Sequence, residues 1–232
     1  KNWNALKLLN SKGEFINSSD GQEVLKIADN FNFDSSQKHI IGDVVEKDNY
    51  IDDHIEKILE LDLIDIDSIK RKNFKIVVDA VNSTGGIAVP KLLEKLNVNV
   101  IKLYCDPTGD FPHNPEPLKE NLSDLSELVI KENADLGIVV DPDVDRLAFV
   151  CENGDVFGEE YTLVACSDYV LSIKPGPTVS NLSSTRALKD ITQTYNCEYH
   201  SSAVGEVNVV EMMKKTGAII GGEGNGGIIL PD

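Results

Sequence analysis

The sequence has few cysteines and histidines, and none of them has the spacing of a metal or redox site. Its four cysteines and four histidines include no C-x-x-C pair and no H-x-x-x-H pair. The sequence therefore argues against a zinc site, and single thiols of this kind are typical of a reduced, cytoplasmic protein. The cysteines are Cys105, Cys151, Cys166 and Cys197, and the histidines are His39, His54, His113 and His200.

Long apolar runs and an excess of positive charge are also missing. No apolar run approaches the roughly 18 residues of a membrane helix, and residues 1–9 lack the apolar core of a secretion signal. With 22 Lys and Arg against 39 Asp and Glu, the formal net charge is −17. Nucleic acid and anionic membranes are therefore poor partners. A phosphorylated substrate would need a metal ion or a few well-placed cations to overcome this field.

What the sequence does contain is an alternation of strand and helix patterns. Hydrophobic residues make up 41% of the 232 residues, and this content is typical of a folded chain. Short β-branched runs alternate with amphipathic stretches, which indicates parallel α/β sheets. We expect two consecutive mixed or parallel α/β domains, at residues 47–153 and 154–232, after a remnant of a preceding α/β domain at residues 1–46. The expected strands cover 75–79, 98–103, 136–140, 178–181, 217–221 and 227–230, and the expected helices cover 87–96, 122–132, 159–171, 184–194 and 204–215.

Turn and cap signals add detail to this pattern. Asn153-Gly154, between two apolar runs, predicts a hairpin over 147–157. Residues 6–9 and 14–16 predict another hairpin around Lys12-Gly13, followed by a short helix near 20–28. Pro90 is expected near the first turn of its helix, and Ser183 or Ser184 is expected to cap the helix at 184–194.

Three acids at alternate positions follow the expected buried strand at 136–140, in Asp141-Pro-Asp143-Val-Asp145-Arg146. Converging carboxylates need a cation, and oxygen ligands suit Mg²⁺ or Ca²⁺. The adjacent Arg146 favours a phosphate in the same site. An EF-hand Ca²⁺ module is an alternative, but it requires Gly where Arg146 stands, and it requires flanking helices. A phosphatase with an aspartyl nucleophile remains a second alternative.

A glycine-rich loop, Gly221-Gly-Glu-Gly-Asn-Gly-Gly227, follows the strand pattern near 217–221. It satisfies G-x-G-x-x-G, the dinucleotide fingerprint, but that fingerprint requires a helix next, and an apolar strand pattern follows instead. The remaining interpretations are a tight glycine turn and a loop that offers Glu223 and Asn225 to sugar hydroxyls. A carboxylate and an amide together can accept from and donate to neighbouring hydroxyls.

These two loops, about 80 residues apart, together resemble the α-D-phosphohexomutase family of phosphoglucomutases, phosphomannomutases and phosphoglucosamine mutases. Three other segments also resemble family motifs, and the resemblance covers essentially the whole chain. They are Asp79-Ala-Val-Asn-Ser-Thr-Gly-Gly86, Gly109-Asp-Phe-Pro-His-Asn-Pro-Glu-Pro117 and Ser201-Ser-Ala-Val-Gly-Glu206.

The resemblance implies a Mg²⁺-dependent isomerase that moves a phosphoryl group between positions 1 and 6 of a hexose. The reaction would pass through a phosphoserine and a bisphosphorylated sugar. The substrate would be a phosphorylated hexose, and phosphoglucosamine mutase is the alternative within the family. The roles implied are metal ligands for Asp141, Asp143 and Asp145, catalysis for Lys7 and Arg146, and substrate binding for Gly205, Glu206, Glu223 and Asn225.

The family's phosphoserine segment and its fourth domain have no counterpart in the sequence. The resemblance therefore implies a fragment, which we expect to fold and to be inactive alone.

Overall fold

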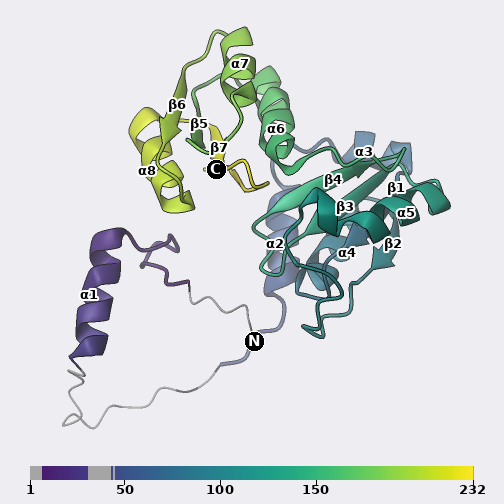
Figure 1. Cartoon of the computed structure of the whole chain (residues 1–232), viewed down its shortest axis with the longest axis horizontal. Helices are drawn as coiled ribbons and strands as arrows, with labels where there is room; N and C mark the ends of the chain where they lie inside the picture. Colours follow the sequence, from purple (N-terminus) through teal and green to yellow (C-terminus); the bar gives the residue numbers. More distant parts are fainter. Residues whose placement is uncertain (1–6, 31–42, 44, 232) are drawn as a thin grey trace. The chain divides into compact units, whose positions relative to one another are not determined.

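The computed structural model describes residues 7–30, 43 and 45–231 (Figure 1). The chain divides into two units, Lys1–Lys47 and Asp48–Asp232. Among the described residues, none of the helices is long and apolar enough to cross a membrane.

The first unit contains a short hairpin and one helix. Leu9 and Phe15 form an antiparallel bridge around Gly13, which has a φ of +77°. This confirms the predicted turn at Lys12-Gly13, although Leu6 lies outside the described residues. Helix α1 (Ser18–Asp29) follows, and the Asn17 side chain caps it by accepting the N–H of Asp20 at 2.9 Å. A polar N-cap residue of this kind satisfies one of the first unpaired N–H groups of a helix.

The second unit begins with two helices and a four-stranded sheet. The strand order is β2-β1-β3-β4, with β1 parallel to β2 and β3, and with β4 antiparallel to β3. The elements are α2 (Tyr50–Leu59), α3 (Ile66–Lys72), β1 (Lys75–Asp79), α4 (Gly85–Lys95), β2 (Asn99–Leu103), the 3-10 turn η1 (Lys119–Asn121), α5 (Ser123–Glu132), β3 (Leu136–Val140) and β4 (Leu147–Cys151).

Each face of this sheet is closed by a separate apolar cluster. Val77 packs with Leu125 and Val129 of α5 on one face, and all three are fully buried. Ile76 and Val78 pack with Leu93 of α4 on the other face. Strands buried on both faces read as continuous apolar runs, which is why 75–79 and 136–140 were predictable. Replacing a fully buried leucine such as Leu125 by alanine costs about 2–5 kcal/mol of folding free energy.

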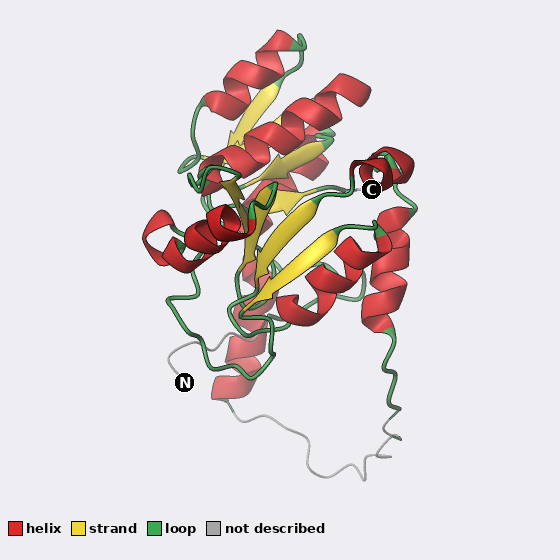
Figure 2. Cartoon of the chain, turned by 90° about the vertical axis from the view of Figure 1, so that its right-hand side faces the viewer, coloured by secondary structure: helices red, strands yellow, loops and turns green. Residues whose placement is uncertain are grey.

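A second sheet repeats this arrangement. Its order is β6-β5-β7-β8, again with two parallel pairs and one antiparallel edge pair. Helices α6 and α7 contribute to one apolar cluster and α8 to another, and Figure 2 shows helices on both sides of the strands. The elements are α6 (Glu159–Ile173), β5 (Thr178–Asn181), α7 (Ala187–Thr194), β6 (Tyr199–Ser202), α8 (Glu206–Thr216), β7 (Ile220–Gly222) and β8 (Ile228–Ile229). The expected α/β class is confirmed.

Two local predictions were wrong, and helices α2 and α3 and strand β6 were not predicted. Helix α4 begins at Gly85, so Pro90 lies inside it and not in its first turn. Neither Ser183 nor Ser184 caps α7, which begins only at Ala187, because both serine hydroxyls donate to the Asn181 side chain. Strand β6 was not predicted, because Tyr-His-Ser-Ser carries no apolar run.

Candidate functional site

The three acids after β3 converge in the structure. Asp141, Asp143 and Asp145 each present a carboxylate oxygen, and these oxygens all lie within 4.8 Å of one another. Asp141 is fully buried, whereas Asp143 and Asp145 are exposed. They stand at the carboxyl end of a parallel strand, where open α/β sheets bind their ligands.

Asp141 anchors its own loop. Its Oδ1 accepts the backbone N–H groups of Asp145 and Arg146, each at 3.1 Å, and its Oδ2 accepts Nε–H of Arg146 at 2.7 Å. Burial raises the pKa of Asp141 to about 6, although the Arg146 hydrogen bonds act in the opposite direction. A buried carboxylate with a raised pKa gains most from a nearby cation, because the cation stabilises the charged form.

Arg146 is held between acids of two loops, with Asp141 and Asp145 in its own loop and Glu116 in the other. Its Nε bonds to Asp141, and its Nη1 lies 3.4 Å from Oε1 of Glu116. Glu116 lies between Pro115 and Pro117, which are both buried and fix the loop there. A guanidinium has five N–H donors, so these two contacts leave donors for an anion.

The loop of acids is also tied to the turn after β1. The Pro142 carbonyl accepts Ser83 Oγ–H at 2.7 Å and Thr84 Oγ1–H at 3.1 Å. Within the loop, Val144 has a φ of +61°, which is costly for a β-branched residue. Strain of this kind persists where the surrounding contacts determine the backbone, and it concentrates at functional sites.

The glycine-rich loop occupies the same position in the second sheet, after β7. Its backbone closes with Glu223 N–H on the Gly227 carbonyl at 3.0 Å, and Gly227 N–H donates to Asn225 Oδ1 at 3.0 Å. Gly226 has a φ of +92°. A Cβ added at Gly226 would meet the Leu147 carbonyl oxygen. Glycine is required at position 226, because it adopts this positive φ readily and has no Cβ to collide with the Leu147 carbonyl.

The two loops are neighbours in space. The N–H of Leu147, the residue after Arg146, donates to the Gly226 carbonyl at 3.2 Å. The Leu147 carbonyl then accepts the Thr162 hydroxyl of α6 at 3.0 Å. The loop that carries the acids and the loop that carries Glu223 and Asn225 are therefore in contact.

Two sequence alternatives do not match this arrangement. An EF-hand needs helices on both sides of its loop, but strands β3 and β4 flank the acids. A dinucleotide site needs a helix after the glycine loop, but strand β8 follows it.

The other predicted site residues have different surroundings. The Gly205 N–H donates to Glu223 Oε1 at 2.9 Å, and Glu206 is the first residue of α8. Lys7 belongs to the first unit, where its Nζ lies 5.7 Å from the centre of the Phe15 ring.

The sequence analysis missed two groups that support the site. Asn181 ends β5 and donates to Glu223. His113 lies in the loop of Glu116, with Nε2 3.0 Å from Asp79 Oδ2 and Nδ1 2.7 Å from the Asn114 carbonyl. The Asp79 hydrogen bond raises the pKa of His113. Asn181 and Asp79, the partner of His113, each lie at the end of a parallel strand. A polar residue at the end of a parallel strand is the sequence signal that could have identified both groups.

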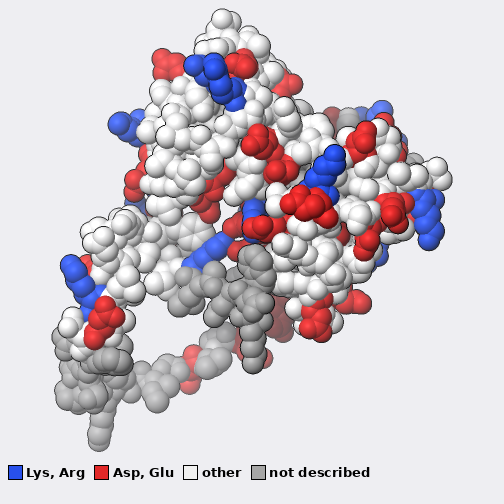
Figure 3. All heavy atoms as spheres, viewed as in Figure 1, with Lys and Arg blue, Asp and Glu red and all other residues white. Residues whose placement is uncertain are grey.

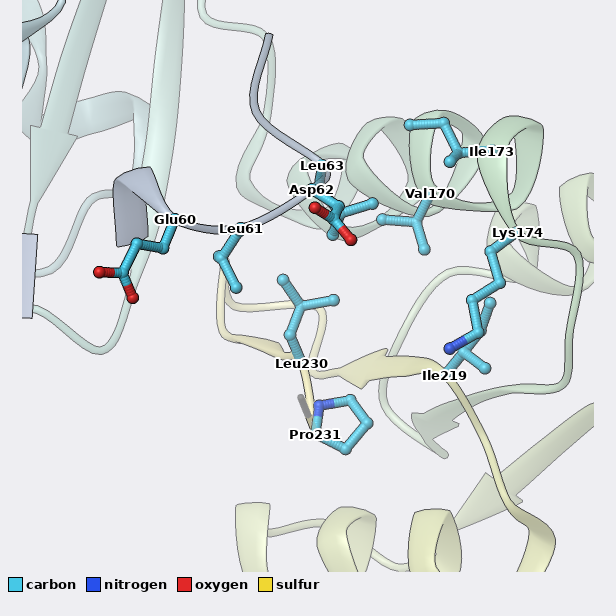
Figure 4. Close-up of a pocket in the computed structure, with 10 residues that line it drawn as sticks. All are labelled: Glu60, Leu61, Asp62, Leu63, Val170, Ile173, Lys174, Ile219, Leu230 and Pro231. Atoms are coloured by element: carbon cyan, nitrogen blue, oxygen red, sulfur yellow. The ribbon is translucent and has the colours of Figure 1, made fainter. Parts of the chain in front are cut away.

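A separate hollow of about 410 Å³ lies between residues 60–63 and the second sheet. Figure 4 shows the side chains of Leu61, Val170, Ile219 and Leu230 around it, with Lys174 at one side. Its lining is mainly aliphatic and contains none of the predicted site residues. Figure 3 shows Asp and Glu spread over the visible surface of the described residues, with Lys and Arg between them.

Comparisons with known proteins match both α/β parts of the chain. The family described as "Phosphoglucomutase/phosphomannomutase, alpha/beta/alpha domain II" matches residues 50–154, and the corresponding domain III matches residues 158–232. A "Phosphoglucomutase/phosphomannomutase" of Thermococcus kodakarensis is 32% identical over 232 residues, which is 99% of this chain and 50% of the relative. A "Probable phosphoglucosamine mutase" of Methanopyrus kandleri has the same identity and coverage.

A solved structure is similar as well. The crystal structure of a phosphoglucomutase/phosphomannomutase family protein from Burkholderia thailandensis superimposes with a TM-score of 0.78 at 26% identity. The match covers 94% of this chain and 46% of that one. The chain thus spans about half the length of the curated relatives it matches.

Proposed function

Because this chain belongs to the phosphoglucomutase/phosphomannomutase family, we propose that it provides the metal-binding and sugar-binding parts of a phosphohexomutase. The reaction is the transfer of a phosphoryl group between positions 1 and 6 of a hexose. In this proposal, residues 47–153 form the metal-binding domain and residues 154–232 form the sugar-binding domain. The observation that carries the proposal is the Leu147–Gly226 hydrogen bond, which joins the two loops.

The acids suit Mg²⁺. Oxygen ligands alone are what this ion prefers, at about 2.0–2.1 Å in an octahedron, so neighbouring oxygens lie about 3 Å apart. The carboxylate oxygens of Asp141, Asp143 and Asp145 are within 4.8 Å of one another, so side-chain shifts of up to about 2 Å bring them to that spacing. When bound, Mg²⁺ offsets the charge of a transferring phosphoryl group.

Arg146 binds the phosphoryl group beside the metal. Its Nε and Nη1 are held by Asp141 and Glu116, so the planar group is already oriented, and little side-chain entropy is lost when it binds an anion. The field of a chain with net charge −17 repels phosphate, and Arg146 with the metal reverses that field locally.

Glu223 and Asn225 bind the sugar. Among the described residues, Oε2 of Glu223 has one hydrogen-bond partner, Asn225 Nδ2 at 3.4 Å. This contact is long, so Oε2 can accept from one hydroxyl while Nδ2 donates to a neighbouring one. The Gly205 N–H donates to Glu223, and in this proposal Gly205 and Glu206 contact the sugar, while Lys7 is proposed to assist proton transfer at the reacting hydroxyl.

The proposal covers more than one hexose phosphate as the substrate. One relative is named a phosphoglucomutase/phosphomannomutase and another a probable phosphoglucosamine mutase, at equal identity. An aspartyl phosphatase is less favoured, because the family models that match residues 50–154 and 158–232 are those of phosphoglucomutases and phosphomannomutases.

Calorimetry on the 232-residue chain tests the metal site. Asp143→Asn should weaken Mg²⁺ binding at least about tenfold, because a charged ligand becomes neutral. The matched control is Asp106→Asn, which makes the same change at an exposed position outside the cluster and should leave the affinity unchanged. Equal affinities in the two variants would contradict the metal assignment, and a site that binds Ca²⁺ but excludes Mg²⁺ would favour a Ca²⁺ module.

Turnover tests the reaction class. The chain alone should bind glucose 1-phosphate without converting it. Conversion to glucose 6-phosphate should require a phosphoserine segment and a phosphate-binding domain supplied from a relative. Release of inorganic phosphate by the chain alone would instead support the phosphatase.

A further inference from the structure

Asn181 is a buried amide with every polar atom assigned to a partner. It ends β5 and is 2% exposed. Its Oδ1 accepts the Ser183 N–H at 3.2 Å, the Ser183 hydroxyl at 3.0 Å and the Ser184 hydroxyl at 2.7 Å. Three donors on one oxygen fix which end of the amide is the acceptor. The NH₂ group must therefore point the other way.

The Asn181 NH₂ group meets Glu223. Nδ2 donates to Oε1 of the carboxylate at 2.5 Å, and hydrogen bonds to a charged acceptor are the strong ones. The Gly205 N–H donates to the same oxygen at 2.9 Å. Gly205 has a φ of +112°, a conformation that glycine adopts readily and other residues rarely adopt. Asn181 at the end of β5 and Gly205, the N-cap residue of α8, thus converge on one oxygen of Glu223, which directly follows β7.

This convergence leaves the two oxygens of Glu223 unequal. Oε1 is held by Asn181 Nδ2 and the Gly205 N–H, while the hydrogen-bond partner of Oε2 within the described part of the chain is Asn225, at the long distance of 3.4 Å. Glutamate side chains have several rotatable bonds and lose entropy when they are fixed. A carboxylate held in advance binds its ligand with less of that loss.

We propose that Asn181 is the positioning residue that orients Glu223, so that Oε2 is directed to a sugar hydroxyl. This inference rests on the proposed function, because it assumes that Glu223 binds the sugar. Asn181 itself does not contact the substrate. It acts by holding Oε1.

The test is Asn181→Asp, which replaces the donor by a carboxylate that faces Glu223. Two adjacent carboxylates do not both ionise readily, and the pair retains one proton to a higher pH. At low pH that shared proton takes the place of the amide hydrogen, and the Glu223 orientation is kept. At high pH both groups are charged and repel each other, so the orientation is lost.

Binding of glucose 1-phosphate to the 232-residue chain is measured by NMR titration between pH 5 and pH 8.5. The quantity compared is the ratio of the dissociation constants of the variant and the unmodified chain at each pH, so that the titration of the phosphate cancels. The ratio should be near one at pH 5 and should reach at least about tenfold at pH 8.5. If Asn181 had a merely structural role, Asn181→Asp would bind glucose 1-phosphate weakly at low pH as well.

Two further measurements keep the outcome interpretable. Asn196→Asp adds the same charge at an exposed position before β6, and its ratio should stay near one at every pH. Mg²⁺ affinity and the circular dichroism spectrum report whether Asn181→Asp folds. If it does not fold, Ser184→Ala removes only one donor to Oδ1 and should weaken sugar binding by a smaller factor.

The possible results separate the two proposals. No binding of glucose 1-phosphate by the unmodified chain would overturn the proposed function. Binding by the unmodified chain with a flat ratio for folded Asn181→Asp would overturn only the role of Asn181. If Ser184→Ala is the variant tested, sugar binding equal to that of the unmodified chain would also overturn only the role of Asn181.

Discussion

His113 holds the loop that carries Glu116, and its removal gives a destabilisation that depends on pH. Both ring nitrogens face acceptor oxygens, on Asp79 and on the Asn114 backbone, so the doubly protonated ring fits best. The Asp79 side chain is 1% exposed and that of His113 is 15% exposed. Around the ring lie Asp79, Asp124 and the edge of Tyr104, and neither carboxylate opposes the positive charge.

The size of the effect follows from this burial. Breaking a fully buried ion pair costs about 3–5 kcal/mol, and losing a hydrogen bond to a charged group costs about 1.5–3 kcal/mol. Asp79 keeps the Val81 N–H at 3.0 Å, and water can reach the space left by the ring. His113→Ala should therefore lower the free energy of unfolding by about 2–3 kcal/mol at pH 6.

The sign of the pH dependence follows from the raised pKa of His113. The extra stability from protonation is fully present below the unfolded pKa of about 6.5, and it is lost as the pH rises through the higher folded pKa. At pH 9 a neutral ring leaves one ordinary hydrogen bond, so the cost of His113→Ala should fall to about 1 kcal/mol.

Urea unfolding followed by circular dichroism at pH 6 and pH 9 measures both values. Hydrogen exchange of residues 104–118 reports the loop directly and should rise more at pH 6 than at pH 9. The matched control is His200→Ala, whose partner Glu198 is 81% exposed, and it should show little change at either pH. A loss in His113→Ala that is equal or greater at pH 9 would refute the charged pair.

Three other changes test the two loops. Gly226→Ala should weaken glucose 1-phosphate binding at least about tenfold, since its φ is +92° and a Cβ would strike the Leu147 carbonyl; unchanged binding in NMR titrations would contradict the close contact. Val144→Gly relieves a φ of +61°, so thermal unfolding should show a gain of up to about 1 kcal/mol, and a clear loss would argue against strain. Ser83→Ala removes a donor to the Pro142 carbonyl and should weaken Mg²⁺ binding several-fold by calorimetry, whereas an unaltered affinity would show that the turn after β1 does not support the metal loop.

Local sequence patterns were sufficient for most strands and for the turns between them. The apolar runs at 75–79 and 136–140 are strands with those bounds, because a strand buried on both faces carries few polar residues. Asn153-Gly154 is a hairpin turn, with Gly154 at a φ of +84° and a bridge between Val150 and Val156.

Prediction failed where tertiary contacts override local preference. Ser183 was a plausible helix cap by composition, but its hydroxyl bonds to Asn181, which in turn is committed to Glu223. Strand β6 has a polar sequence and exists because β5 offers its backbone edge. Neither pairing leaves a signal in the residues immediately around it.

The sequence by itself determined the class of fold, the two loops and the chemistry of their side chains, because propensity, apolar periodicity and ligand type are local properties. Only the tertiary structure decided that Glu116 reaches Arg146, that Asn181 and Gly205 share one oxygen of Glu223, and that Leu147 bonds to Gly226. These contacts join residues 18 to 79 positions apart, and the physical reason is the parallel topology, which gathers the carboxyl ends of separate strands at one edge of each sheet.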